Sequence, residues 1–179
     1  DRLREPVRLG FGLQEDLSLS DEARDRALAC LERFGECLRG YPSRSVRIVG
    51  TKTLRTVKDS TQFLVEAEKR LGHPVEIISG DEEARLIYLG VANDIAPDGD
   101  NRIVMDIGGG STEVIIGKGM QPRLKESLNM GCIAITKKFF MEGKVTEKLI
   151  TKALIACLQE IEPVKEEFLQ AGWQQVLGA

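Results

Sequence analysis

The sequence predicts a mixed α/β fold, and three observations support this prediction. Short runs of β-branched and apolar residues alternate with amphipathic helical segments in the first half of the chain. A group of three β-rich runs then follows, and two further helical segments come after it. Strands that alternate with helices, then a β-meander and more helices, are typical of the mixed α/β class.

The first half begins with residues 6–13, whose apolar side chains alternate and predict an extended strand. Ser20 is placed to cap a helix, with acidic residues in its first turn, and Gly40 ends it. The following elements continue the alternation: strands at 45–50 and 75–78, a helix from Asp59 or Ser60, and a helix after the capping-box spacing at 79–82.

The second half begins with a polar, turn-forming loop at 93–101. The elements expected after it are strands at 102–107, 112–117 and 122–128, helices at 132–140 and 147–171, and a strand at 174–177. Helical spacing makes five apolar residues of the long helix candidates for the core: Leu149, Leu154, Leu158, Ile161 and Phe168.

Charge and cysteine content exclude several functions. The chain has 25 Lys and Arg and 28 Asp and Glu, a net charge of -3, which argues against a general nucleic-acid binder. Cys30 and Cys37 share a helix face and are expected to pack as small apolar groups, and no cysteine pair has zinc-ligand spacing. His73 is expected in an exposed turn. No apolar run approaches the roughly 20 residues of a membrane span.

The strongest chemical signal is the segment 106–113 (DIGGGSTE), in which a buried strand ends on Asp106 and a returning strand carries Glu113. Glycine has no Cβ and tolerates positive φ, so its backbone amides can approach phosphate oxygens closely. Ser111 and Thr112 add hydroxyl groups, and the two carboxylates suit Mg²⁺. The alternative is a glycine-rich hairpin without a ligand.

Two weaker signals accompany it. Asp81, Glu82 and Glu83 begin a helix, where the dipole alone explains acidic residues. Successive helical residues diverge by about 100°, so one carboxylate at most points easily into a cleft, and periodicity does not select it. Residues 50–55 (GTKTLR) follow a strand and are expected to form a phosphate-binding loop or a solvated one. Residues 130–132 (MGC) are interpreted as structural.

Together these segments resemble the exopolyphosphatase and guanosine pentaphosphate phosphohydrolase family. The resemblance rests on residues 48–55 (IVGTKTLR), 75–87 (VEIISGDEEARLI) and 104–113 (VMDIGGGSTE), with MGC at 130–132 and Gly172-Trp173 in addition. It implies the actin-like ATPase architecture of two ribonuclease-H-like domains, with 1–86 and 87–179 as parts of the two. Composition alone would place the boundary in the 93–101 loop.

The resemblance also implies roles for individual residues. Glu83 corresponds to the general base, Arg55 contacts phosphate, and Asp106 and Glu113 hold Mg²⁺, with a monovalent cation such as K⁺ as an option. The implied phosphate-binding residues of the glycine loop are Gly108, Gly109, Gly110, Ser111 and Thr112.

The function implied is hydrolysis of the terminal phosphate of inorganic polyphosphate, since the GGGS and VGT segments favour the exopolyphosphatase branch. The alternatives are hydrolysis of guanosine pentaphosphate, a nucleotide of the stringent response, a non-catalytic nucleotide- or phosphate-binding regulator, and a sugar kinase or ATPase of the same superfamily. The parent protein is expected to be a cytoplasmic homodimer, with peripheral membrane association as an option.

Two family features are not found in the sequence: an initial Asp-x-Gly-Ser-Asn-Ser loop and a later Gly-Ala-Ser-Gly-Thr loop. The first residue is also not Met. We therefore expect a fragment that lacks the first strands of the fold and is itself inactive.

Overall fold

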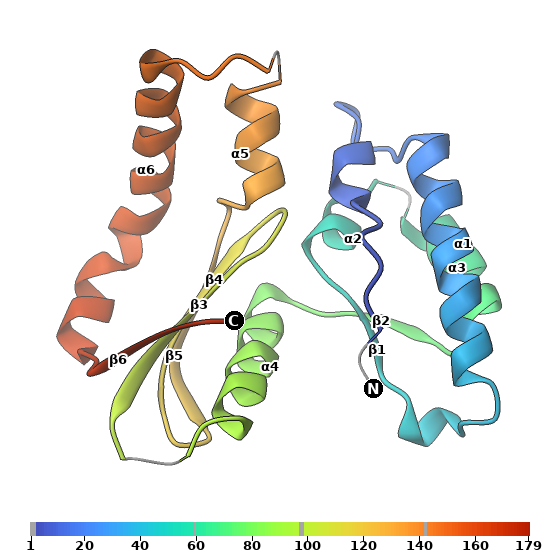
Figure 1. Ribbon diagram of the computed structural model, residues 1–179, viewed down its shortest axis with the longest axis horizontal. Helices are drawn as coiled ribbons and strands as arrows, with labels where there is room; N and C mark the ends of the chain where they lie inside the picture. The colour runs from blue at the N-terminus through green and yellow to red at the C-terminus, as the bar shows by residue number, and fades with distance from the viewer. Residues whose placement is uncertain (1–2, 59, 97–98, 142) are drawn as a thin grey trace. The chain divides into compact units, whose positions relative to one another are not determined.

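The computed structural model describes residues 3–58, 60–96, 99–141 and 143–179 (Figure 1). The chain forms two compact units, Asp1–Ser79 and Gly80–Ala179. Each unit combines helices with a sheet. The predicted mixed α/β class is therefore confirmed.

The first unit is built on two long helices that pack against each other. They are α1 (Asp21–Leu38) and α3 (Ser60–Leu71), and their common core contains Ala27, Leu28, Phe63 and Ala67. The predicted cap is confirmed, because Ser20 Oγ accepts a hydrogen bond from the Ala23 amide at 3.4 Å. The strands β1 (Ile48–Gly50) and β2 (Val75–Ile77) pair in parallel.

Two segments of the first unit differ from the sequence predictions. Residues 6–13 do not form a strand: Leu9–Gly12 is a short 3-10 helix, η1, which follows Arg8 in a left-handed conformation with φ of 52°. Val7 and Leu9 pack against the core between α1 and α3, so their alternation reflects burial on helices rather than pairing in a sheet. Lys52–Thr56 forms the short helix α2 where a loop was expected.

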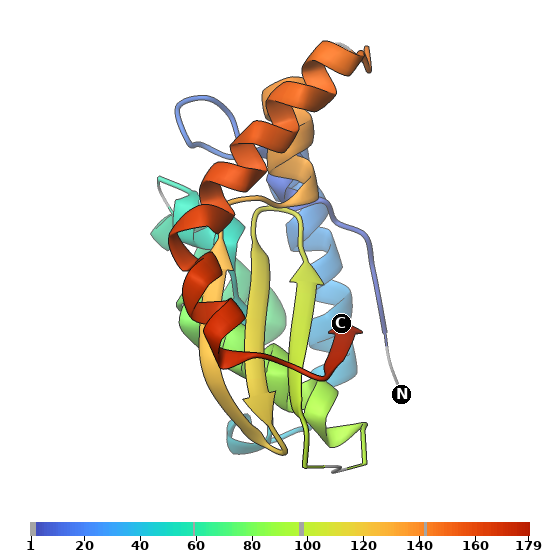
Figure 2. The same cartoon turned by 90° about the vertical axis from the view of Figure 1, so that its left-hand side faces the viewer.

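The second unit contains a four-stranded sheet with helices on both faces (Figures 1 and 2). Its strands are β3 (Asn101–Ile107), β4 (Thr112–Lys118), β5 (Gln121–Leu128) and β6 (Gln175–Gly178), in the order β5-β4-β3-β6. The first three form the predicted antiparallel meander, and β6 pairs in parallel with β3. Its helices are α4 (Gly80–Asn93), α5 (Cys132–Phe139) and α6 (Glu147–Ala171).

Alternation along the strands gives the two faces of this sheet different partners. Val104 and Ile115 belong to the core beneath α4, together with the fully buried Ala84 and Tyr88 of that helix. On the other face, Ile103, Ile116 and Phe168 form the core beneath α6. Side chains at even positions of β3 therefore face α4.

Several sequence expectations about burial were wrong. Leu154 and Leu158 of α6 are 57% and 50% exposed, because only the part of α6 around Phe168 packs on the sheet. Cys30 is buried but Cys37, near the end of α1, is exposed. The cysteines are free, as expected.

The start of α4 coincides with the division between the two units. The helix packs on the sheet of the second unit, and the division falls between Ser79 and Gly80. Residue 86, where the boundary was expected, lies inside α4, and composition alone would have placed the cut after it. Among the described residues, no helix has both the length and the apolar character needed to cross a membrane.

Candidate functional site

The β3–β4 hairpin brings the two predicted metal-binding carboxylates together. Asp106 and Glu113 are direct partners in the antiparallel register of the two strands. Because directly opposite residues lie on the same face of a sheet, both side chains face α4, as Val104 and Ile115 do. The structure thus supports the expected convergence of these two acids. Their convergence depends on the register of β3 and β4, which the sequence did not determine.

The environment of the two acids is polar but largely closed to water. Glu113 is 1% exposed, and its Oε1 accepts a hydrogen bond from Ser127 Oγ of β5 at 2.7 Å. Burial, and then the negative charge of Glu113, raise the pKa of Asp106 above its usual value. A partly buried carboxyl beside a buried carboxylate favours either a proton or a cation between them.

Ser127 is a site residue that the sequence interpretation missed. Its position on β5 is set by register, since Ser127 is the partner of Glu113 in the β4–β5 ladder. The hydroxyl therefore extends the row formed by Asp106 and Glu113 across three strands. In the sequence, the only signal for Ser127 was its position in the predicted strand at 122–128. That prediction did not specify which residue of the neighbouring strand Ser127 would face.

The glycine turn, residues 108–110, owes its composition to close approach rather than to unusual backbone angles. Among the described residues, neither Gly108 nor Gly109 has a positive φ. The Gly108 amide donates to the Ser111 carbonyl at 2.9 Å, which closes the turn. A Cβ on Gly109 would lie 3.0 Å from Ile133 Cδ1, so the absence of a side chain lets α5 lie against the turn.

The hydroxyl residues that follow the turn are buried. Ser111 and Thr112 are 3% and 2% exposed, and Thr112 Oγ1 donates to the Met130 carbonyl at 2.6 Å. This bond ties the start of β4 to the segment that leads into α5. The segment 130–132, interpreted as structural from the sequence, is thus in direct contact with the glycine turn.

The three acids at the start of α4 have different environments. Glu82 forms a two-pronged ion pair with Arg85 of the same helix, at 2.6 and 2.8 Å. Asp81 pairs with Lys125 of β5 at 3.0 Å, which places the start of α4 beside the end of the sheet that carries Ser127 and Glu113. Asp81 and Glu82 thus each form an ion pair with a basic residue of the second unit.

Helical geometry separates the side chain of Glu83 from that of Asp81 on the surface of α4. The fully buried Ala84 marks the side of the helix that faces the sheet. Asp81 and Glu83 lie on opposite flanks of that side, since successive residues are separated by about 100°. Asp81 is directed toward β5 by its pairing with Lys125, and Glu83 lies on the opposite flank of the helix.

Arg55 lies in the first unit, at the end of α2, whereas the other predicted site residues lie in the second unit. Its Nη1 donates to the Ile78 carbonyl at 2.7 Å, just after β2. A guanidinium group is a planar, charged donor suited to phosphate, and this bond fixes the direction of the side chain.

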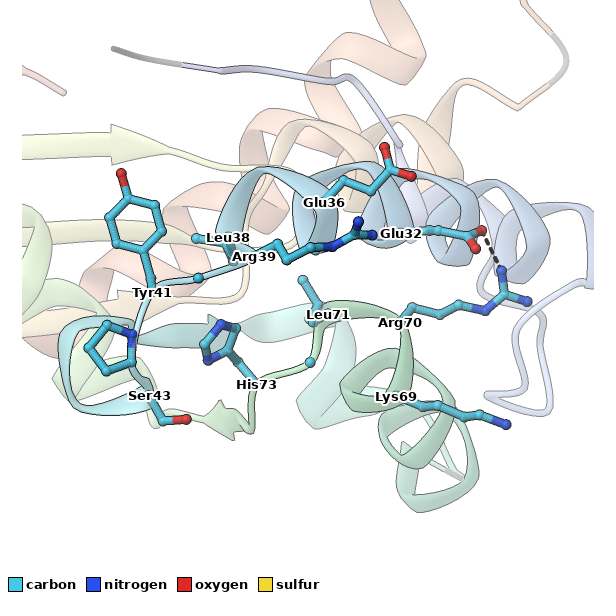
Figure 3. A pocket seen from close by; sticks show the side chains of 14 residues that line it. Glu32, Glu36, Leu38, Arg39, Tyr41, Ser43, Lys69, Arg70, Leu71 and His73 are labelled. Carbon is cyan, nitrogen blue, oxygen red and sulfur yellow. Dashed lines mark hydrogen bonds and ion pairs between the residues drawn. The ribbon is translucent and has the colours of Figure 1, made fainter.

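A hollow of the first unit contains none of the predicted site residues. It has a volume of about 860 Å³ and lies where α1 and α3 end (Figure 3). Arg39 and Lys69 line it together with Glu32 and Glu36, so its charge is mixed. Helix carboxyl ends also disfavour anions. We therefore do not assign a phosphate site to it.

His73, which lines this hollow, was expected to be exposed but is only 8% exposed. It lies in the turn between α3 and β2, and Figure 3 shows its side chain lining the hollow. The Gly-His-Pro sequence by itself predicts an exposed turn. It does not predict the burial of His73, which depends on tertiary packing.

The topology and the glycine-turn hairpin define the ribonuclease-H-like, actin-like ATPase class of folds. Within this class, the sequence matches the Ppx/GppA phosphatase family over residues 1–179, and the chain therefore belongs to that family.

Curated relatives carry two different names. A guanosine-5'-triphosphate,3'-diphosphate pyrophosphatase of Vibrio cholerae is 40% identical over 178 residues, which are 99% of this chain and 36% of the relative. A Haemophilus influenzae protein provisionally named an exopolyphosphatase is also 40% identical, over 99% of this chain and 55% of its own length. The chain thus spans between about a third and about half of these relatives.

Solved structures of the family have the same fold. An exopolyphosphatase from Cytophaga hutchinsonii has a TM-score of 0.85 and 27% identity, covering 96% of this chain and 55% of that protein. A Ppx/GppA enzyme of Aquifex aeolicus has a TM-score of 0.72 and 28% identity, covering 97% of this chain and 56% of that protein.

Proposed function

We propose that the protein containing this chain hydrolyses the terminal phosphoanhydride bond of inorganic polyphosphate. The observation that carries the proposal is the pairing of Asp106 with Glu113 across a glycine turn, on the sheet face covered by the acidic start of α4. Membership of the Ppx/GppA phosphatase family supports the reaction class. The exopolyphosphatase branch is favoured by the GGGS and VGT segments of the sequence.

In this proposal Glu83 is the general base. It follows Glu82, whose carboxylate is held by Arg85, and it lies on the flank of α4 opposite Asp81. A carboxylate there accepts the proton of a water molecule that attacks the terminal phosphorus atom in line with the leaving oxygen. Glu83 thereby both orients the water and increases its nucleophilicity.

The glycine turn supplies donors for the transferred group. Among the hydrogen bonds of the described residues, none is donated by the Gly109 or Gly110 amide to a protein acceptor. Both amides are therefore suited to phosphoryl oxygens, which carry most of the charge in the transition state. Arg55 is proposed to contact the substrate phosphates through its guanidinium group.

The residues present fit Mg²⁺. Asp106 and Glu113 offer hard oxygen ligands on one face. Burial, and then the charge of Glu113, raise the pKa of Asp106, and such a site favours a cation. Within the described part of the chain no cluster of three or more acidic, histidine or cysteine ligands occurs, and Mg²⁺ needs only one or two carboxylates. When bound, the ion would neutralise charge on the phosphate oxygens.

A second candidate function is hydrolysis of guanosine pentaphosphate, favoured by relatives of that name at 40–42% identity. Both reactions break a terminal phosphoanhydride bond, and the residues above serve either of them. Regions of the substrate beyond the terminal phosphates decide between the two.

The test is phosphate release by the full-length protein with Mg²⁺, from long-chain polyphosphate and from guanosine pentaphosphate in parallel. We expect the larger kcat/KM for polyphosphate. A larger kcat/KM for the nucleotide would replace the first proposal by the second. Binding of both without phosphate release would identify a non-catalytic regulator, and phosphate transfer from ATP to a sugar would identify a kinase.

A further inference from the structure

The connection between β5 and α5 packs backbone against backbone on the glycine turn. A Cβ on Gly131 would lie well inside 3.0 Å of the carbonyl carbon and oxygen of Gly109 and of the carbonyl carbon of Gly110. These are main-chain atoms, which cannot rotate away as a side chain can. No residue except glycine fits at position 131 unless the turn or α5 moves.

The first amides of α5 bind the carbonyl groups of the turn. The Cys132 amide donates to the Gly108 carbonyl at 2.9 Å, and the Gly109 carbonyl accepts from the amides of Ile133 and Ala134 at 2.8 and 3.1 Å. The first amides of a helix have no partner within the helix, so these bonds satisfy them. The start of α5 is thus occupied by the turn itself.

These bonds determine the direction of two other amides. In a trans peptide the carbonyl and the following N–H point in opposite directions, and no cis peptide occurs among the described residues. The Gly108 carbonyl points to α5, so the Gly109 N–H points away from it. The same relation links the Gly109 carbonyl to the Gly110 N–H. The two amides that donate to no protein acceptor are therefore the two whose peptide planes α5 holds.

We propose that Gly131 is a positioning residue for the phosphoryl group, acting through the peptide planes of Gly109 and Gly110. The proposal rests on the proposed function, because it names the two donors of that site and what orients them. Thr112 belongs to the same support, since its hydroxyl donates to the carbonyl of Met130, the residue before Gly131. Its buried hydroxyl holds the connection in place and does not contact the substrate in this proposal.

The first experiment compares Gly131→Ala with Gly90→Ala in the full-length protein. Gly90 is exposed on α4, and a Cβ there meets no atom within 4 Å, so it is the matched control. Removal of one preorganised donor from an oxyanion site costs about 10²–10³ in kcat. We expect Gly131→Ala to lower kcat for polyphosphate by about this factor with a smaller change in KM, and Gly90→Ala to leave both unchanged. Wild-type kcat in Gly131→Ala would overturn the proposal.

A second pair of variants keeps the proposal testable if Gly131→Ala does not fold. Gly109→Ala places a Cβ 3.0 Å from Ile133 Cδ1, an atom that valine lacks. We expect Gly109→Ala to lower kcat, and Gly109→Ala with Ile133→Val to recover at least about tenfold, since residues in contact show coupling. Absence of recovery would show that the contact between α5 and the turn does not position the donors.

A binding measurement separates this inference from the proposed function. Amide resonances of Gly109 and Gly110 are followed during titration with pyrophosphate and Mg²⁺. If the wild-type protein releases no phosphate from any substrate, the proposed function fails. The inference still predicts that both resonances shift with pyrophosphate in the wild type and in Gly90→Ala, and that these shifts are lost in Gly131→Ala or, should it not fold, in Gly109→Ala. Equal shifts in all variants, or no shift in the wild type, would refute it.

Discussion

Replacement of Asp106 by asparagine is expected to stabilise the second unit at neutral and alkaline pH. Burial and the facing carboxylate of Glu113 raise the pKa of Asp106 in the folded chain. A carboxyl with a raised folded pKa contributes stability that is fully present below its unfolded pKa and is lost as pH rises through the folded value. Asparagine has the same shape and never acquires the charge, so the variant avoids this loss.

The register of the hairpin gives the magnitude of this effect. Directly opposed residues of an antiparallel pair have Cβ atoms about 4.5–5.5 Å apart. Two unit charges about 5 Å apart repel by about 3 kcal/mol at an effective dielectric constant of about 20. Asp106 is only half-buried, so water reduces this repulsion. We expect the free energy of unfolding of Asp106→Asn to exceed that of the wild type by about 1–2 kcal/mol.

The single tryptophan of the chain provides the assay. Trp173 packs against Ile103, Ile116 and Phe168 on the sheet that carries Asp106, so its fluorescence reports the unfolding of this unit in urea. The advantage of the variant should grow as the pH rises from about 4, near the unfolded pKa of an aspartate, to an alkaline upper pH, because Asp106 ionises in the folded wild type along this range. Equal stability at the upper pH, or an advantage independent of pH, would refute the reasoning.

Magnesium should reverse the order of stability. A ligand at about 100 times its Kd stabilises a folded protein by about 2.7 kcal/mol. We expect Mg²⁺ to stabilise the wild-type chain in the same urea assay and to stabilise Asp106→Asn much less. Equal stabilisation of the two chains would show that Asp106 and Glu113 do not share a cation.

Two further changes test the surroundings of this site. In the full-length protein, Glu83→Gln should lower the turnover of polyphosphate by about 10²–10⁴. Glu82→Gln is the matched control and should cost far less, because the Glu82 carboxylate is held by Arg85. Equal losses in kcat would contradict the assignment of the base. Tyr88→Phe removes the hydrogen bond of 3.1 Å from the phenol to the Gly119 carbonyl and keeps the buried ring. The free energy of unfolding in urea should therefore fall by about 0.5–1.5 kcal/mol. An unchanged midpoint would mean that this bond contributes nothing to stability.

The sequence by itself determined the order and type of most elements. The predicted long helix at 147–171 matches α6, and the three predicted strands at 102–128 form the antiparallel meander. These elements depend on local features: apolar periodicity, a capping residue such as Ser20, and a glycine turn. The same local features marked Asp106, Glu113 and the acidic triplet as candidates.

Tertiary structure decided how these candidates are combined. The sequence placed two acids on neighbouring strands, but only the register put Asp106 opposite Glu113 and Ser127 beside them. Periodicity left the three acids of α4 equivalent. The structure pairs Asp81 with Lys125 and Glu82 with Arg85, whereas the role proposed for Glu83 comes from the family resemblance.

The segment 6–13 and Gly131 show the physical reason. Apolar alternation at 6–13 satisfied the pattern of a strand, yet the chain there buries Val7 and Leu9 between helices, because burial and not pairing decides the conformation of such a short run. Gly131 carried no local signal of its own. Its importance comes from the main chain of Gly109 and Gly110, more than twenty positions earlier, and contacts between segments so far apart arise only when the whole unit packs. Local interactions thus set helices, turns and strands, while register and close backbone approach follow from the non-local packing of the folded unit.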